Sequence, residues 1–400
     1  MKRKLNKSTL SVIGYWLIMI LLLVMYFTND FGLLDLRKTS VVIGVGLDVE
    51  EEQVVLTAQL AVPQPAENGE NTKFNVVTGR GATVADALNE VNVKTGFYPK
   101  LLFCKLVLLG ESCFKSDVRE LLDYFYRNEY TGLTLNVVAC EGQASKLIAQ
   151  QFPCGNSATD VIDKLLSTEA QASGNVAAQN LKDVGEKLFS KSQAAYMPYL
   201  ENGILEESQG GGSGGEGGGS GGSGGGGAGQ QCEESELTCN KCAVFGGGYF
   251  KGVFSTDETF ALTLLLSDVK HAFLKCGEEG DVRVLGLRGC KGGVDLKIED
   301  DKPVLELKFT ATAKEQDGED GFSPERAKET RISKEVLKLG EDAVCKIFAA
   351  LVDNSVKTDC DVLGLKTMLY KKNAGKYDKF AETLLQDLTV KCNVKLKSSG

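Results

Sequence analysis

The hydrophobic pattern begins with an uncharged run from Leu10 to Phe27. A helix of this length rises about 27 Å, close to the thickness of the hydrocarbon core of a bilayer. Four cations precede the run and are expected to stay in the cytoplasm: Lys2, Arg3, Lys4 and Lys7. Residues 1–30 are therefore predicted to be a basic flank and a single transmembrane anchor, which places the following residues on the outer side of the membrane. The expected anchor residues include Leu10, Trp16, Leu22 and Phe27.

Two other interpretations of this run are less consistent with the pattern. A cleaved signal peptide has a shorter apolar core and a site of small residues, whereas Tyr26 and Phe27 close this run. A lipoprotein signal would place a cysteine directly after the run, but the first cysteine is Cys104. A helix buried in a soluble core would show a polar face, and none interrupts this run.

After the anchor, short β-branched runs alternate with segments of helical periodicity. Thr83 is a candidate helix cap before apolar positions at helical spacing, and Asp117–Tyr126 has a second apolar face. Strands that alternate with helices indicate an α/β domain of about a hundred residues. The expected strands are 41–47, 54–62, 100–109 and 133–139.

The second half of the chain begins with a tract that lacks the apolar side chains needed to form a packed core. Residues 210–229 are almost entirely glycine and serine, which predicts a disordered insertion, either a linker or an enlarged loop. Further on, apolar residues alternate with charged ones over 294–298 and 305–311, which predicts a long hairpin with one wet face. Helices are expected from Ser323 to Leu351 and near Asp359 and Lys376, and the chain ends in a lysine-rich edge strand at 390–397.

Composition narrows the classes of function. The net charge is −9, and the only concentrated basic cluster is the membrane flank. A nucleic-acid partner is therefore not expected, because phosphate neutralisation supplies most of that affinity. The 12 cysteines lie mostly inside apolar runs, which predicts buried thiols that act as small hydrophobic residues.

One cysteine cluster has a spacing typical of ligands. Cys232, Cys239 and Cys242 could bind zinc or form a redox pair, but a second pair of ligands at metal-binding spacing is missing. The only histidine, His271, is expected to lie in a loop. The Gly44-Val45-Gly46 segment is half of a dinucleotide fingerprint, without the third glycine or the following helix. We therefore expect no catalytic residue, no cofactor and no identifiable small-molecule site.

A series of short segments resembles, in order, the landmarks of the spore germination C-subunit family, Ger(x)C. The matches extend over about 38–398 and leave out the glycine tract. They are VIGVGLD at 42–48, PKLLFCKLVLLG at 99–110, YFYR at 124–127, AVF at 243–245 leading to Gly252, and DVLGL at 361–365 followed by LYKK at 369–372.

The resemblance implies a mixed α/β fold of three consecutive domains. After the single N-terminal transmembrane helix we expect them at 38–150, at 155–290 with the disordered Gly-rich insertion 208–231, and at 291–400. It also implies a non-catalytic subunit of a nutrient germinant receptor, on the outer face of the spore inner membrane, with A-type and B-type (permease-like) subunits as partners. Two alternatives are an anchored thiol-redox or metal-binding protein that uses Cys239 and Cys242, and a sporulation surface protein outside any receptor.

Overall fold

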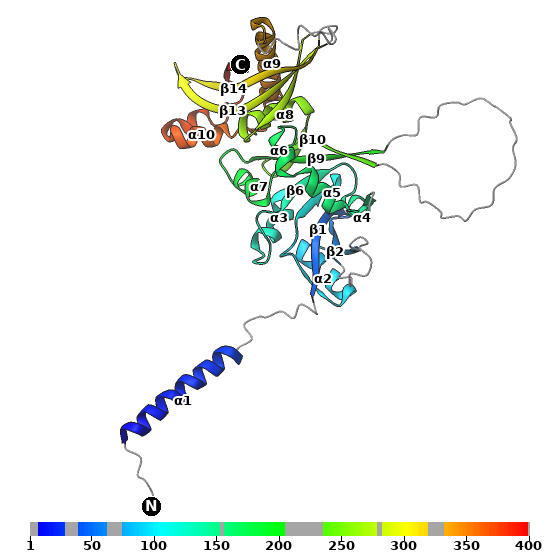
Figure 1. The fold of residues 1–400 in the computed structure, drawn as a ribbon, viewed down its shortest axis with the longest axis vertical. Coiled ribbons are helices and arrows are strands. Elements are labelled where there is room, and N and C mark those ends of the chain that lie inside the picture. Colours follow the sequence, from blue (N-terminus) through cyan, green and yellow to red (C-terminus); the bar gives the residue numbers. More distant parts are fainter. Residues whose placement is uncertain are drawn as a thin grey trace, which may run out of the picture.

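The protein, described here from a computed structural model, has the predicted mixed α/β fold, with two main sheets (Figure 1). The structure describes residues 7–28, 39–61, 74–152, 156–204, 235–277, 282–318 and 332–398. The predicted disordered insertion 208–231 lies outside these ranges, as do Cys232 and the predicted helix start at Ser323. Figure 1 shows the second sheet at one end of the folded body and β1, β2 and α2 at the other.

The first sheet contains nine strands in the order β11-β10-β9-β6-β5-β1-β2-β3, with β4 paired to β1. Strands β4, β1, β5, β6 and β9 run parallel to one another, and the pairs outside this group are antiparallel. The bounds are β1 Thr39–Glu50, β2 Gln53–Ala61, β3 Phe74–Gly81, β4 Tyr98–Lys100, β5 Leu106–Leu109, β6 Asn136–Cys140, β9 Ala194–Ile204, β10 Ser235–Gly246 and β11 Tyr249–Phe254.

Helices cover both faces of the first sheet, so its central strands are buried on both sides. Along β5, Val107 and Leu109 join the hydrophobic cluster under α2, α3 and α7, whereas Leu106 and Leu108 join the cluster under α4 and α5. This alternation follows from the two-residue period of a strand. The helices are α2 Val84–Thr95, η2 Glu111–Lys115, α3 Val118–Arg127, α4 Ala144–Ala149, α5 Ala158–Leu165, α6 Thr168–Ala172 and α7 Leu181–Leu188.

The second sheet has four strands in the order β12-β13-β14-β15. The predicted hairpin is confirmed as β13 and β14, and the predicted edge strand as β15, which pairs in parallel with β14. The bounds are β12 His271–Cys276, β13 Arg283–Glu299, β14 Lys302–Gly318 and β15 Thr389–Ser398, with helices α8 Thr256–Leu266, α9 Lys334–Lys357, α10 Leu365–Lys372 and α11 Ala374–Phe380. A separate two-stranded sheet pairs β7 Gln151–Phe152 with β8 Asn156–Ser157.

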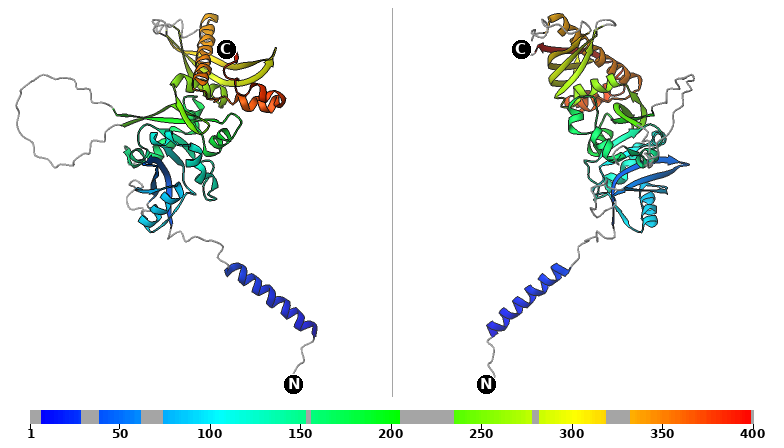
Figure 2. Two further views of the ribbon diagram at one scale, coloured as in Figure 1. Left: turned by 180° about the vertical axis from the view of Figure 1, so that it is seen from behind. Right: turned by 45° about the vertical axis from the view of Figure 1, so that its right-hand side comes forward.

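One hydrophobic cluster joins the two sheets. It includes Tyr196 and Val244 of the first sheet, Phe260 and Leu264 of α8, and Phe309 of the second sheet. Helix α8 therefore lies between the sheets, and its capping box at Ser255 and Glu258 starts it. Figure 2 shows the two sheets within one folded body, from behind and after a turn of 45°.

Three expectations about elements need correction. The predicted strand 100–109 is two short strands, β4 and β5, because the backbone turns between Leu101 and Cys104. The predicted helix near Asp359 begins only at Leu365, and His271 starts strand β12 instead of lying in a loop.

The strands of the two sheets do not follow the domain boundaries that were expected from the sequence. The first sheet takes strands from both 38–150 and 155–290, and the boundary expected after residue 290 falls inside β13. The division into three domains stays a prediction.

At the start of the chain, α1 (Lys7–Thr28) is a 22-residue helix. Trp16, Leu22 and Phe27 are exposed on it, and the Leu10 side chain lies outside the described residues. Among the side chains that the structure describes, no helix combines the length and hydropathy of a membrane span.

Candidate functional site

The two describable cysteines of the predicted ligand cluster point into different hydrophobic clusters. Cys239 packs with residues of β5, β6 and α4, whereas Cys242 packs with residues under α8, where Thr259 Oγ1 lies 3.4 Å from its sulfur. A bulge in the pairing of β10 with β9 separates the two positions. Within the described ranges, no group of three or more metal-ligating side chains occurs. The geometry does not bring Cys239 and Cys242 into one site.

The protonation of these two thiols follows from their burial. Burial raises the pKa of Cys239 and of Cys242 to about 12. Because the thiolate is the form that attacks disulfides and binds metals, both side chains are poorly suited to either reaction at neutral pH. Their surroundings are those of structural core residues.

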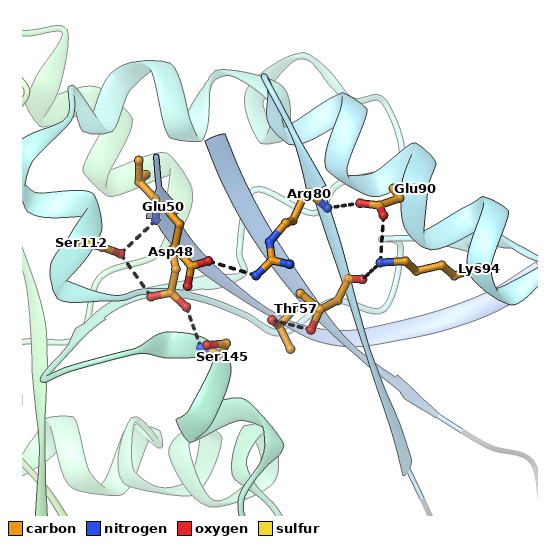
Figure 3. A network of polar contacts seen from close by, with 10 residues as sticks. Asp48, Glu50, Thr57, Arg80, Glu90, Lys94, Ser112 and Ser145 are labelled. Carbon is orange, nitrogen blue, oxygen red and sulfur yellow. Dashed lines mark hydrogen bonds and ion pairs between the residues drawn. The ribbon is translucent and has the colours of Figure 1, made fainter. Parts of the chain in front are cut away.

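A buried carboxylate, Asp48, lies at the end of β1 and ties three elements together (Figure 3). Its Oδ1 accepts a hydrogen bond from the backbone N–H of Ala144 at 3.0 Å, and its Oδ2 accepts one from Ser145 at 2.8 Å. These N–H groups begin α4 and have no partner inside the helix. The hydroxyl of Ser112 in η2 donates to Oδ1 at 3.3 Å and accepts from the backbone N–H of Val49 at 2.9 Å. The carboxylate thus joins β1, η2 and α4.

Glycines make room for this arrangement. A Cβ atom on Gly110 would lie 2.0 Å from Asp48 Oδ1, and one on Gly46 would lie 3.1 Å from the Ala144 carbonyl. A Cβ atom on Gly44 would lie 2.1 Å from the Thr159 hydroxyl of α5. The glycines of the Gly44-Val45-Gly46 segment therefore allow α4 and α5 to approach β1. This close packing accounts for the two glycines that resemble half of a dinucleotide-binding motif.

A chain of exposed ion pairs runs from the end of β1 to α2 (Figure 3). Arg80 Nη2 lies 3.0 Å from Glu50 Oε2, and the backbone N–H of Arg80 donates to Glu90. Lys94 then pairs with Glu90 at 2.9 Å and donates to the carbonyl of Thr78. Exposed pairs of this kind contribute little to stability because water screens them. They orient the surface of β3 and α2 instead of forming a reactive centre.

A cavity of about 800 Å³ opens beside Asp48. It lies between the tip of the β1–β2 hairpin, the start of α2 and the η2–α3 segment, and Ser112 lines it. Burial favours the neutral form of Asp117 in its wall, but hydrogen bonds from Arg119 outweigh this effect and lower the pKa of Asp117. The wall carries both acidic and basic side chains, among them Glu51, Glu120, Lys115 and Arg127.

A second buried carboxylate, Asp361, caps α10 at the other end of the body. Its two oxygens accept hydrogen bonds from the backbone N–H groups of Leu365 at 2.8 Å and Lys366 at 2.7 Å. Gly364 precedes the helix with a φ of 75°, a left-handed conformation that favours glycine. Burial raises the pKa of Asp361, against the lowering effect of these backbone hydrogen bonds.

A clasp between Ser192 and Thr367 connects this cap to the first sheet. The two hydroxyl oxygens lie 2.9 Å apart, and each accepts a hydrogen bond at 3.1 Å from the backbone N–H of the other residue. Ser192 lies just before β9, whereas Thr367 lies in the first turn of α10. Nearby, the Cys360 thiol is 3.5 Å from the carbonyl of Phe245 in β10. The start of α10 is thus held against the first sheet.

Together these features define a class of protein: a mixed α/β fold with two sheets that share one hydrophobic core and with helices capped by buried carboxylates. Comparison with known families is more specific. A family model described as "Spore germination protein N-terminal domain" matches residues 34–202, and one described as "Spore germination B3/ GerAC like, C-terminal" matches residues 240–400. The chain belongs to this GerAC family of spore germination proteins.

Two further comparisons complete this result. Among solved structures, one titled "Crystal Structure of the GerBC protein" is similar at 14% identity with a TM-score of 0.49, over 88% of this chain and 96% of that chain. No curated protein matches the chain.

Sequence reasoning identified segments but not the partners of their residues. Asp48 and Asp361 were part of the family landmarks, without a structural role. Ser112, Ser192 and Thr367 carried no signal, because single serines and threonines are common and the partner of each of these three lies far away in the sequence.

Proposed function

We propose that this protein is the C subunit of a spore nutrient germinant receptor and acts without catalysis in receptor assembly and germination signalling. The observation that carries this proposal is the order of the family matches: both halves of the family occur, over 34–202 and 240–400, on one chain. The A-type and B-type subunits are its proposed partners. A spore inner membrane location, on the outer face, follows from the same assignment.

We further propose that α1 anchors the protein in that membrane. The support is the combination of four cations before the apolar run with apolar side chains that are exposed from Val12 to Phe27. Exposed apolar side chains in such number are costly in water and are favourable in lipid. A tether also raises the local concentration of weakly associating partners without new contacts.

The Gly-rich insertion 208–231 is proposed to be an enlarged, disordered loop of the second of the three predicted domains. Strands β9 and β10 flank it and pair with each other, with Ile204 opposite Ser235. The described residues nearest to the insertion on either side, Ile204 and Ser235, are therefore close together. This arrangement favours a loop within one hairpin over a linker between separate bodies.

Gene deletion tests the receptor role directly. Spores without this protein are expected to lose the response to at least one nutrient, and the full-length gene should restore it. Copurification of the A-type and B-type subunits from spore membranes tests assembly. Unchanged germination with every nutrient tested would contradict the proposal and favour a sporulation surface protein outside the receptor.

The thiol alternative has a separate test. A Cys242→Ser variant that keeps normal germination and metal content would exclude a redox or metal role for this cysteine. Burial of Cys239 and Cys242 in different clusters already makes such a shared role unfavourable.

A further inference from the structure

Exposed apolar side chains gather at one edge of the first sheet. They come from the end of α2 and from the segments before β4, β5 and β6. The set, called here the apolar rim, is Val93, Phe97, Tyr98, Leu102, Phe103, Tyr130 and Leu133. Leu102 and Phe103 are each more than half exposed, although most apolar residues of the same family landmark are buried. Exposed apolar groups that lie together mark a site of contact with a protein or a membrane.

Topology explains why these residues lie together. Strands β1, β4, β5 and β6 run parallel to one another, so their amino ends meet at one edge of the sheet. Thr39, where β1 begins, is paired with Tyr98 of the rim. A hydrogen bond to the Glu129 carboxylate is the main cause that raises the pKa of Tyr130, and the hydroxyl of Tyr98 adds a smaller electrostatic effect in the same direction. The rim therefore lies beside the point where the chain arrives from α1.

We propose that the apolar rim inserts into the headgroup region of the membrane that holds α1. This inference rests on the proposed anchor. Residues 29–38 connect α1 to β1 and span at most about 35 Å when fully extended, which keeps this edge of the sheet within reach of the lipid surface. Tyr and Phe side chains with neighbouring Leu are suited to the interface, and Lys100 in β4 adds a cation next to anionic headgroups.

Insertion orients the folded body on the membrane. With only a tether, the body would rotate freely and present any face to its membrane-embedded partners. With the rim in the headgroups, the second sheet is directed away from the bilayer, because it lies at the opposite end of the body (Figure 1).

Fluorescence quenching tests this proposal with the full chain in vesicles of phosphatidylethanolamine and phosphatidylglycerol, with or without brominated acyl chains. Trp16 is the only tryptophan of the protein. Its quenching in the wild-type chain tests the anchor. A Leu102→Trp variant in a Trp16→Phe background tests the rim, and a Phe273→Trp variant in the same background is the matched control, because Phe273 is exposed on the second sheet.

The expected result is at least a twofold quenching of the tryptophan at position 102 by brominated lipid, with a blue-shifted emission, and no quenching at position 273. Equal emission at position 102 in both kinds of vesicle would overturn the rim proposal while quenching of Trp16 upheld the anchor. Absence of quenching for Trp16 itself would overturn the anchor, and with it the basis of the rim proposal.

A second, independent observation concerns two thiols of the second sheet. The sulfur of Cys345 in α9 lies 2.6 Å from the sulfur of Cys392 in β15. Cys392 is exposed and Cys345 is half-buried, whereas the other eight describable cysteines are buried. A disulfide bond requires sulfurs about 2.05 Å apart, so a small movement suffices.

We infer that Cys345 and Cys392 form a disulfide bond when they meet a low-molecular-weight disulfide. Thiolate attack on that disulfide releases one thiol, and the second cysteine then displaces the other, so that two protein thiols become one S–S bond and the reagent becomes two thiols. The bond would attach the last strand of the chain to α9. Burial and the neighbouring Cys345 raise the pKa of Cys392 to about 12, so the reaction should be faster at alkaline pH.

The test is incubation of the full chain with oxidised glutathione, followed by alkylation and peptide mass analysis. The expected product is a peptide pair linked through Cys345 and Cys392, together with a higher melting temperature that a Cys392→Ser variant does not show. Full alkylation of both cysteines after this treatment would overturn the inference, as would glutathione adducts without the internal link.

Discussion

Each of the two sheets is associated with a buried aspartate that caps a helix, but the two aspartates differ greatly in their sequence separation from the helix that they cap. Asp48 of the first sheet and Asp361 beside the second are both buried, and each accepts two backbone N–H groups at the start of a helix. Asp361 caps a helix that begins four residues later, whereas Asp48 caps a helix that begins 96 residues later.

The difference separates local from tertiary structure. The Asp361 cap can form as soon as its own turn closes, and the clasp between Ser192 and Thr367 then holds α10 against the first sheet. At Asp48 the helix cap and the tertiary contact cannot be separated, because one side chain both caps α4 and holds it to β1 and η2. A change at Asp48 should therefore disturb more of the molecule than the same change at Asp361.

The largest expected effect comes from Asp48→Ala. It leaves the N–H groups of Ala144 and Ser145 and the Ser112 hydroxyl without their acceptor, and each unsatisfied buried donor costs about 1–3 kcal/mol. We expect the free energy of unfolding to fall by about 3–5 kcal/mol in urea titrations. Glu50→Ala, at the exposed end of the same strand, is the control and should change it little. Equal effects of the two substitutions would contradict the role given to Asp48.

Asp361→Asn should have a smaller effect that depends on pH. Burial raises the pKa of Asp361, so the folded state binds this proton more tightly than the unfolded state. Stability from this group is then greatest at low pH and is lost as pH rises from the unfolded pKa through the folded one. The wild-type advantage over Asp361→Asn should be largest at pH values below the unfolded-state pKa of an aspartate and should shrink as pH rises above it. An advantage that grows with pH would show that the carboxylate is favoured in its charged form.

Whether a structural feature could be predicted from the sequence depends on how far apart in the chain the interacting residues are. The cap at Thr83 and the β13–β14 hairpin were predicted, because a helix cap and an alternating pattern are local signals. The break between β4 and β5 was missed, because a turn within an apolar run has the same composition as a buried strand. The bond from Asp48 to Ser145 could not be predicted, since nothing near either residue indicates the other.

The Ser192–Thr367 clasp predicts coupling between the two sheets. Ser192→Ala and Thr367→Val should each lower the free energy of unfolding by about 1 kcal/mol, since each removes hydrogen bonds at a partly buried contact. In a double-mutant cycle, the two effects should fail to add by about 0.5–1 kcal/mol. Strict additivity would mean that each residue acts alone and that α10 is held to the first sheet by other contacts.

The smallest effect is expected from excision of residues 208–231, which touches neither carboxylate. If the tract is a loop inside the β9–β10 hairpin, shortening it reduces the entropy cost of closing that hairpin and should stabilise the protein by about 1 kcal/mol. A matched variant, in which the tract is replaced by a glycine–serine sequence of equal length, should match the wild type in urea titration. A large loss of stability on excision would contradict the loop, because it would mean that β9 and β10 pair only when a long connection lets them approach. A gain would show that the first sheet is continuous across the tract, so that Asp48 and the Ser192–Thr367 clasp act on one folded unit.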